Sequence, residues 1–151
     1  ERNHCGPSVW EAQKYKPTII ISPLSKINSD SEQVLIEGDL LFFMSTADPV
    51  LVESGMILPR AHRETVFDLT EDEWAESFTF LAEVKKYLDE KYSPDGYNVG
   101  WNVGSSGGMS IPHSHMHVIP RFDDEPLAGK GIRNQLKQPE NRRRSAGDFS
   151  Q

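Results

Sequence analysis

The fold class is decided by the stretch TEDEWAESFTFLAEVKKYLDEK, which is residues 70–91. Thr70 and Glu73 form a capping box, in which the side chain of each residue satisfies a free backbone amide of the other. Apolar side chains then recur every three or four residues, at Trp74, Phe78, Leu81, Val84 and Leu88. This spacing predicts an amphipathic helix over residues 71–91 that packs these five side chains against a sheet.

Short apolar segments lie on both sides of this helix. Before it, residues 33–37 and 40–45 are predicted to be strands joined by a glycine-containing turn, and residues 55–59 a third strand. After it, residues 97–103 alternate between apolar and polar side chains, and residues 113–120 are expected to form the last strand. One helix between groups of strands with short connections indicates an α+β fold rather than a doubly wound parallel sheet.

The composition is that of an ordinary globular protein, with 36% hydrophobic and 26% charged residues. We expect one domain over residues 1–151, with a core at about 33–121, an N-terminal extension at 1–32 and a polar tail at 122–151. No apolar stretch approaches the roughly 20 residues that cross a bilayer, so no membrane partner is expected. The start lacks an apolar signal segment and the single cysteine, Cys5, cannot form an internal disulfide. A cytoplasmic location is therefore expected.

The charge is unevenly distributed along the chain. A net charge of −7 argues against general binding to nucleic-acid backbones, which basic surfaces favour. From Arg121 onward, however, there are seven Lys or Arg residues and five Asp or Glu residues. The triplet at residues 142–144, three arginines, has two interpretations: a solvated surface, or an arm that faces a phosphate or another subunit.

Three histidines alternate near the end of the predicted core, at His113, His115 and His117. In a strand they would lie on one face, about 6.5 Å apart. A purely structural role is a poor explanation, because three imidazoles carry a large desolvation cost when buried. Metal binding is an alternative, but no carboxylate or thiolate partner stands at motif spacing. Phosphoryl chemistry fits better, because histidine is neutral, nucleophilic and able to carry a proton near pH 7.

The residues upstream of the histidines suit a phosphate ligand. The stretch at residues 104–108 is rich in glycine and serine, and Ser110 follows it. Such a loop is expected to offer backbone amides and a hydroxyl group to phosphate oxygens. Asn102 has the parity of the polar face of its predicted strand, so we expect it to share a surface with the histidines.

The run His113-Ser-His-Met-His-Val-Ile119 resembles the pattern His-φ-His-φ-His-φ-φ, with φ broadly apolar, of the histidine-triad (HIT) superfamily. The similarity extends back through residues 96–102, 107–110, 67–70 and 58–62. It implies a HIT-like five-stranded antiparallel sheet with one main helix and shorter helical segments, usually paired as a homodimer. It also implies a nucleotidyl hydrolase or transferase that acts on nucleoside phosphoramidates or dinucleoside polyphosphates.

The resemblance assigns roles by position. His115 corresponds to the nucleophile, which forms a covalent nucleotidyl-histidine, and His117 to the neighbour that contacts the phosphate and helps to deliver the proton. His113 and His62 correspond to a supporting hydrogen-bond network. The phosphate and leaving-group side is implied to be held by Asn102, Gly108 and Ser110. No cofactor is required, and no divalent metal is implied by the motif; the expected ligand is an AMP-type nucleotide.

Three positions depart from the family pattern. Thr46 stands where the family often has an acidic or amide residue that grips the ribose, Ser54 where it often has another histidine, and Met109 where it often has glutamine. The alternative function is therefore a nucleotide-binding or sensing module with little turnover.

Overall fold

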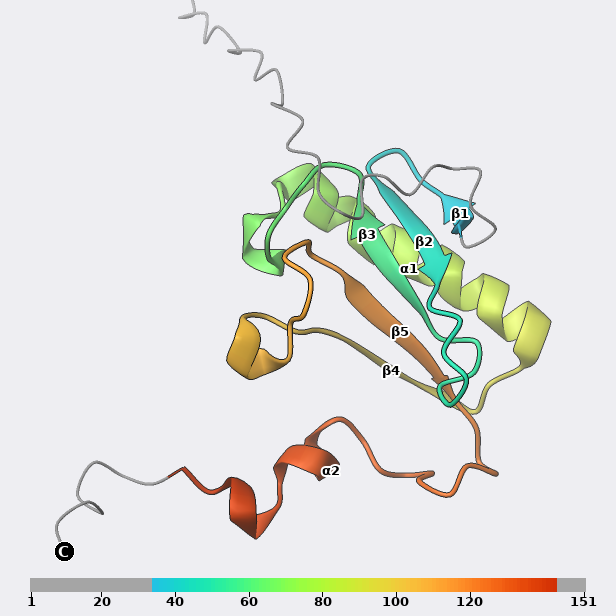
Figure 1. Cartoon of the computed structure of the whole chain (residues 1–151). Coiled ribbons are helices and arrows are strands. Elements are labelled where there is room, and N and C mark those ends of the chain that lie inside the picture. Colours follow the sequence, from blue (N-terminus) through green and yellow to red (C-terminus); the bar gives the residue numbers. More distant parts are fainter. Residues whose placement is uncertain (1–33, 144–151) are drawn as a thin grey trace, which may run out of the picture.

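The computed structural model describes residues 34–143, which form a five-stranded antiparallel sheet with one long helix on one face (Figure 1). The strand order is β1-β2-β3-β5-β4. The strands are β1 (Val34–Glu37), β2 (Leu41–Ser45), β3 (Gly55–Pro59), β4 (Gly96–Trp101) and β5 (Met116–Arg121). The long helix is α1 (Glu71–Tyr92). The predicted α+β class is confirmed, whereas the proposed N-terminal extension at residues 1–32 lies outside the described residues.

Shorter helical segments complete the described chain. They are the 3₁₀ turns η1 (Val66–Asp68), η2 (Ser105–Gly107) and η3 (Pro139–Asn141), and the single-turn helix α2 (Arg133–Leu136). None of the helices in the described part is long and apolar enough to cross a membrane.

Helix α1 begins at the predicted capping box. The Thr70 hydroxyl accepts a hydrogen bond from the Glu73 amide at 3.1 Å, and the Thr70 amide donates to the Glu73 carboxylate at 2.8 Å. The helix ends one residue later than expected, and Ser93 caps it in the left-handed conformation with φ 50°. Local sequence thus set both ends of this element.

The predicted apolar stripe of α1 is partly wrong. Trp74 and Phe78 are 54% and 80% exposed, and Phe80 faces the core instead. The buried helix positions are Glu73, Ser77, Phe80, Val84 and Leu88. Two neighbouring stripes of the helix have the same periodicity, so spacing alone could not decide which one faces the sheet.

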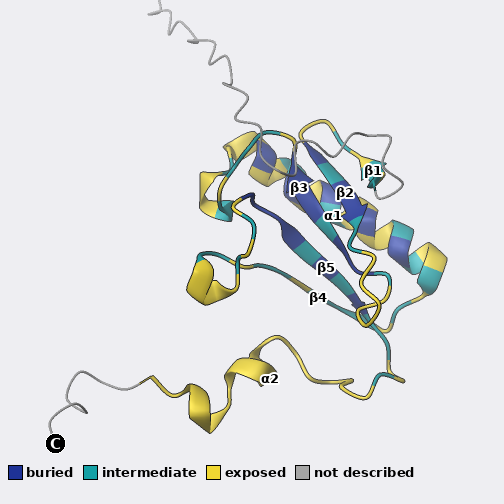
Figure 2. Ribbon diagram, viewed as in Figure 1, coloured by how far each residue is buried: buried dark blue, intermediate teal, exposed yellow. Residues whose placement is uncertain are grey.

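The core lies between α1 and the central strands (Figure 2). Its fully buried side chains are Leu41, Phe43, Ile57, Phe80, Val84, Leu88, Met116 and Val118. Gly55 is required in this packing, because a Cβ atom at that position would lie 2.4 Å from the ring of Phe43. The opposite face of the sheet, called the open face here, carries the residues of alternate parity. Met56, His117 and Gly100 are register partners across three strands of this face.

Candidate active site

The last strand begins later than predicted, and this changes how the histidines lie. Strand β5 begins at Met116, so His113 and His115 precede it and only His117 lies on it. The residues 113–116 are all buried, without the alternation of a strand. The reason is local hydrogen bonding, since the His113 amide donates to Ile111 and the Ser114 amide donates to Arg63 instead of to a neighbouring strand. The prediction of three imidazoles in a row on one strand face is therefore wrong.

The four histidines of this region meet as two ring pairs. His62 and His113, called the inner pair here, lie edge to face with ring centroids 5.4 Å apart. His115 and His117, called the outer pair, lie edge to face at 4.8 Å. Among the described residues no group of three His, Cys, Asp or Glu side chains is arranged to hold a metal ion.

His113 is 1% exposed and anchors the inner pair. Its Nε2 lies 2.9 Å from the carbonyl oxygen of Pro59, at the end of β3. Because a carbonyl only accepts, Nε2 must carry the hydrogen. Burial lowers the pKa of His113, and the neighbouring His62 and His115 lower it further. His113 is thus held as a neutral donor.

His62 extends the inner pair from the loop after β3. It is half-buried, and its Nδ1 is buried without a hydrogen-bond partner among the described residues. A buried nitrogen without a hydrogen-bond partner costs free energy. The structure places His62 in ring contact with His113, and the hydrogen-bond network that the resemblance implies for these two residues stays a prediction.

His115 has a defined tautomer. Its Nδ1 lies 2.8 Å from the backbone oxygen of His113, so Nδ1 carries the hydrogen and donates it. In the neutral ring, Nε2 is then the nitrogen with the lone pair. The side chain is only 7% exposed, which fixes the ring in place. A neutral imidazole with one nitrogen anchored is a ready nucleophile.

His117 brings a second imidazole beside it on the open face. Burial lowers the pKa of His117, and the neighbouring His115 adds to this effect. The ring is half-buried on β5, opposite Gly100 of β4. The absence of a side chain at Gly100 leaves space above the backbone beside this ring. The outer pair therefore combines a lone-pair nitrogen with an accessible proton carrier.

The glycine-rich loop differs from its expected form. The amides of Gly107, Gly108 and Met109 donate to carbonyl groups of residues 104 and 105 within the η2 turn. These amides are used inside the loop, so the predicted cradle of free amides at these three residues is not formed. Gly108 has φ 86°, and a Cβ atom there would lie 3.7 Å from Nδ2 of Asn102. Asn102 is therefore beside Gly108.

Asn102 and Ser110 are exposed and carry the polar side chains of this loop region. Strand β4 ends at Trp101, two residues earlier than predicted, so Asn102 follows the strand. It continues the parity of Gly100, the register partner of His117. Asn102 therefore has the parity of the open face, and its predicted contact with the phosphate stays a prediction.

An ion pair that sequence reasoning did not identify connects the site to α1. Glu73 is 3% exposed and accepts from Nε of Arg63 at 2.9 and 3.1 Å, in addition to capping the helix. The backbone oxygen of Arg63 accepts from the amide of Ser114, at 2.6 Å. Arg63 therefore links the helix start to the residue between His113 and His115. The only sequence signal for this ion pair was Glu73. Its role in the capping box already explained that residue, so the sequence did not indicate a second partner.

Thr46 and Ser54 bind each other at the ends of β2 and β3. Their hydroxyl oxygens are 2.6 Å apart, and the Thr46 hydroxyl and amide both approach the Ser54 carbonyl oxygen, at 3.0 and 3.1 Å. Ser54 has the same parity as Met56, the register partner of His117. The nearby Asp48 carboxylate accepts from the amides of Val50 and Leu51, inside its own loop. The hydroxyl pair, rather than a carboxylate, therefore occupies this part of the open face.

Comparison with known proteins gives a family match and named relatives. The family model described as the HIT domain matches residues 28–124. The AP-4-A phosphorylase of Mycobacterium tuberculosis is 28% identical over 107 residues, which are 70% of this chain and 55% of that protein. The asymmetrical bis(5'-nucleosyl)-tetraphosphatase of Schizosaccharomyces pombe is 30% identical over 73 residues, 48% of this chain and 40% of that protein. The chain thus spans about half the length of these curated relatives, or less.

Solved structures share the fold. A hypothetical histidine triad nucleotide-binding protein from Sulfolobus tokodaii has a TM-score of 0.58 at 25% identity, over 62% of each chain. A HIT family member from Bacillus subtilis has a TM-score of 0.62 at 24% identity, over 69% of this chain and 75% of that one. The arrangement of the five-stranded sheet and its helix is therefore the one found in these proteins.

Proposed function

The chain belongs to the HIT family, and from that premise we propose that it is a nucleotidyl hydrolase or transferase. Its substrates are nucleoside phosphoramidates or dinucleoside polyphosphates, and its intermediate is a covalent nucleotidyl-histidine at His115. The observation that carries this proposal is the 2.8 Å hydrogen bond from His115 Nδ1 to the His113 backbone oxygen. It leaves Nε2 with the lone pair that a nucleophile needs.

In the first step, Nε2 of His115 attacks the phosphorus atom of the nucleotidyl group. A bond from nitrogen to phosphorus forms, and the bond from phosphorus to the leaving nitrogen or oxygen breaks. His117 in its protonated form gives its proton to the leaving atom. The positive charge on the substituted His115 ring is stabilised by the Nδ1 hydrogen bond to the His113 carbonyl.

In the second step, water attacks the same phosphorus atom. Neutral His117 accepts the proton of the water, the nitrogen–phosphorus bond breaks, and the nucleoside monophosphate leaves with His115 restored. Another acceptor in place of water would make the reaction a transfer. The same residues serve both outcomes, and named relatives include a phosphorylase and hydrolases.

The other polar groups of the site would hold the nucleotide. Asn102, Ser110 and the turn at Gly108 would contact the phosphate, a role supported by the position of Asn102 beside Gly108. His113 and His62 would keep His115 in its position from beneath. The Thr46 and Ser54 positions would face the sugar of an AMP-type nucleotide, with a hydroxyl pair in place of a carboxylate.

The test is release of AMP from adenosine 5′-phosphoramidate and from a diadenosine polyphosphate. We expect turnover by the natural chain and a loss of about 10⁴-fold or more in His115→Ala, because the nucleophile is removed. Acid-quenched protein should carry a nucleotidyl adduct on His115 in mass spectra. An unchanged rate in His115→Ala would contradict the assignment.

A second candidate is a nucleotide-binding or sensing module with little turnover. It is favoured by the hydroxyl pair of Thr46 and Ser54, whose groups are already bonded to each other. Micromolar binding of AMP by calorimetry, without hydrolysis of either substrate, would support this function over the first.

We also propose that the protein is a homodimer. Strand β4 is at the edge of the sheet, and Trp74 and Phe78 are exposed near it, with Trp74 stacked on Trp101 of β4 at 5.7 Å. A second copy would pair with the strand edge and cover the aromatic rings. Light scattering should give twice the mass of the chain, and Phe78→Glu should give the mass of a monomer.

A further inference from the structure

The C-terminal segment differs sharply in charge from the rest of the described chain. Residues 130–143 contain five Lys or Arg residues and one Asp or Glu residue. Residues 34–129 contain six Lys or Arg residues and seventeen Asp or Glu residues. A body this acidic repels a polyanionic substrate, so a concentrated positive segment near the site would change where such a substrate binds.

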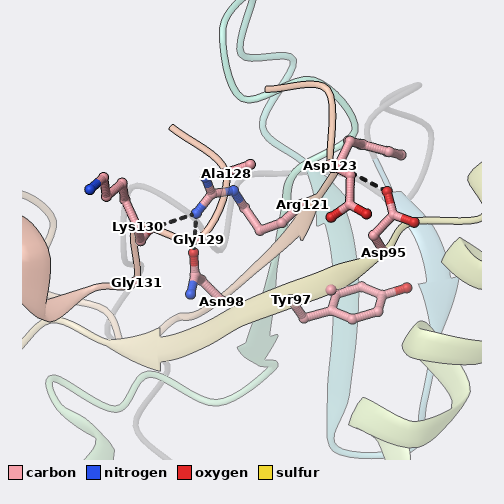
Figure 3. A pocket seen from close by; sticks show the side chains of 11 residues that line it. Asp95, Tyr97, Asn98, Arg121, Asp123, Ala128, Gly129, Lys130 and Gly131 are labelled. Atoms are coloured by element: carbon pink, nitrogen blue, oxygen red, sulfur yellow. Dashed lines mark hydrogen bonds between the residues drawn. The ribbon is translucent and has the colours of Figure 1, made fainter. Parts of the chain in front are cut away.

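This segment is fixed to β5, which carries His117, and to the neighbouring β4. Arg121, the last residue of β5, donates to Asn98 of β4 at 2.6 Å and pairs with Glu125 at 2.6 Å. Its guanidinium also donates to the carbonyl groups of Leu127 and Lys130, each at 3.2 Å. Figure 3 shows the bonds from Arg121 to Asn98 and to Lys130. One half-buried side chain therefore holds the start of the segment against β4 and β5, whereas the sequence predicted only a polar tail.

The segment reaches the histidine site itself. A Cβ atom at Gly100 would lie 3.9 Å from Cδ1 of Ile132, and Gly100 is the register partner of His117. Ile132 is therefore beside Gly100, the residue that pairs with His117 across β4 and β5. Arg133 follows it at the start of α2, and Lys130 precedes it by two residues. Within the described residues, Lys130, Arg133 and Lys137 take part in none of the ion pairs.

A cavity of about 300 Å³ lies between the segment and the strands. Its base is formed by Gly96, Asn98 and Arg121, and its wall by the backbone of residues 128–131. The carboxylates of Asp95 and Asp123 line one side and Lys130 lines another (Figure 3). Along β4, Asn98 is two residues from Gly100, so the cavity continues the open face away from His117.

We propose that residues 126–137 form a leaving-group subsite for oligophosphate. The phosphates beyond the scissile bond of a dinucleoside polyphosphate run from His117 past Ile132 and bind Lys130, Arg133 and Lys137. This inference rests on the proposed function for the identity of the scissile bond, but the binding of phosphates to the segment is independent of turnover. The subsite would favour long, highly charged leaving groups. Each added phosphate brings negative charge that the basic segment attracts and the acidic rest of the chain repels.

The experiment compares the natural chain with Lys130→Gln/Arg133→Gln/Lys137→Gln. A control, Lys85→Gln/Lys86→Gln/Lys91→Gln, changes the net charge equally on α1, across the sheet from the site. Calorimetry with inorganic tripolyphosphate at low ionic strength measures the dissociation constant. We expect the first variant to bind about tenfold more weakly, because each exposed cation contributes roughly a factor of two. The control should stay within about twofold, and added salt should weaken the natural chain most.

Turnover separates this inference from the proposed function. The kcat/KM for diadenosine tetraphosphate should fall about tenfold in the first variant, mainly through KM, while that for adenosine 5′-phosphoramidate should change less than about twofold. Equal tripolyphosphate binding by the first variant and the natural chain, or an equal loss in the control, would overturn the subsite. A natural chain that hydrolyses neither nucleotide would contradict the proposed function, and the tripolyphosphate titration would still decide the subsite.

Discussion

The inner pair, His62 and His113, and the outer pair, His115 and His117, are joined through the His113 backbone oxygen but lie in different physical environments. His113 is 1% exposed and donates to the carbonyl of Pro59, 54 positions earlier in the chain. His117 is half-buried on the open face, beside a glycine. This difference indicates that the two pairs have different roles in the site. The inner pair holds the backbone of the site, and the outer pair presents its reactive nitrogens.

Among the variants that keep the nucleophile His115, the largest effect should come from the proton carrier of the outer pair. His117→Gln is expected to lower kcat for a diadenosine polyphosphate by about 10² to 10⁴-fold, because general acid catalysis by an imidazole is lost. The free energy of unfolding, measured by urea denaturation, should change by less than about 1 kcal/mol, since the ring is only half-buried. If His117→Gln lost much stability but kept its kcat, His117 would have a structural role and the assignment to the outer pair would be wrong.

The inner pair should show the opposite balance. His113→Ala is expected to lower the free energy of unfolding by about 2–4 kcal/mol, because it leaves a cavity and an unpaired Pro59 carbonyl. Its kcat should fall by a smaller factor than in His117→Gln. Urea denaturation followed by tryptophan fluorescence, together with kcat at a temperature where the variant is folded, measures both quantities. A stable His113→Ala protein would show that the inner pair does not hold the site.

The link from α1 to the pairs should have an intermediate effect. Glu73→Gln removes the charge that holds Arg63 and is expected to lower the free energy of unfolding by about 1–2 kcal/mol, since Arg63 is partly exposed to solvent. The kcat should fall several-fold with little change in KM, because the Arg63 carbonyl positions Ser114 between His113 and His115.

The matched control for this link is Glu71→Gln. Glu71 is exposed in the same first turn of α1, so the variant changes the charge near the helix start without affecting Arg63. It should cost no more than about 0.5 kcal/mol and leave kcat unchanged. Equal kcat values for Glu73→Gln and Glu71→Gln would show that Glu73 does not position the site.

The smallest expected effect is on how the free energy of unfolding depends on pH, and it tests the contribution of the outer pair. Burial lowers the folded-state pKa of His113 and His117 below the ordinary value of 6.5. The unfolded chain therefore takes up protons first as the pH falls, so stability is fully present above pH 6.5 and declines below it. The free energy of unfolding of His117→Gln, measured from pH 7.5 to 5, should decline less steeply than that of the natural chain. An identical slope would show that the outer pair is not coupled to folding.

Much of the fold could be predicted because its signals are local. The capping box of Thr70 and Glu73 marked the start of α1, and the strand at residues 55–59 has the predicted bounds. The choice between Phe78 and Phe80 as the core residue could not be predicted, because the sheet that selects one helix stripe is built from distant segments. The start of β5 was missed for a similar reason, since the Ser114 amide binds Arg63 instead of a strand partner.

The sequence by itself determined the chemistry available, because imidazoles near a glycine-serine loop are a property of residue type and order. It also determined where the helix and most strands lie, since capping, turns and periodicity act over a few residues. Only the tertiary structure decided which imidazole is a buried donor and which has a free lone pair. Those states depend on the carbonyls of Pro59 and His113 and on the β3–β5 pairing. The position of the basic segment beside Gly100 was likewise set by Arg121, whose partners span residues 98–130.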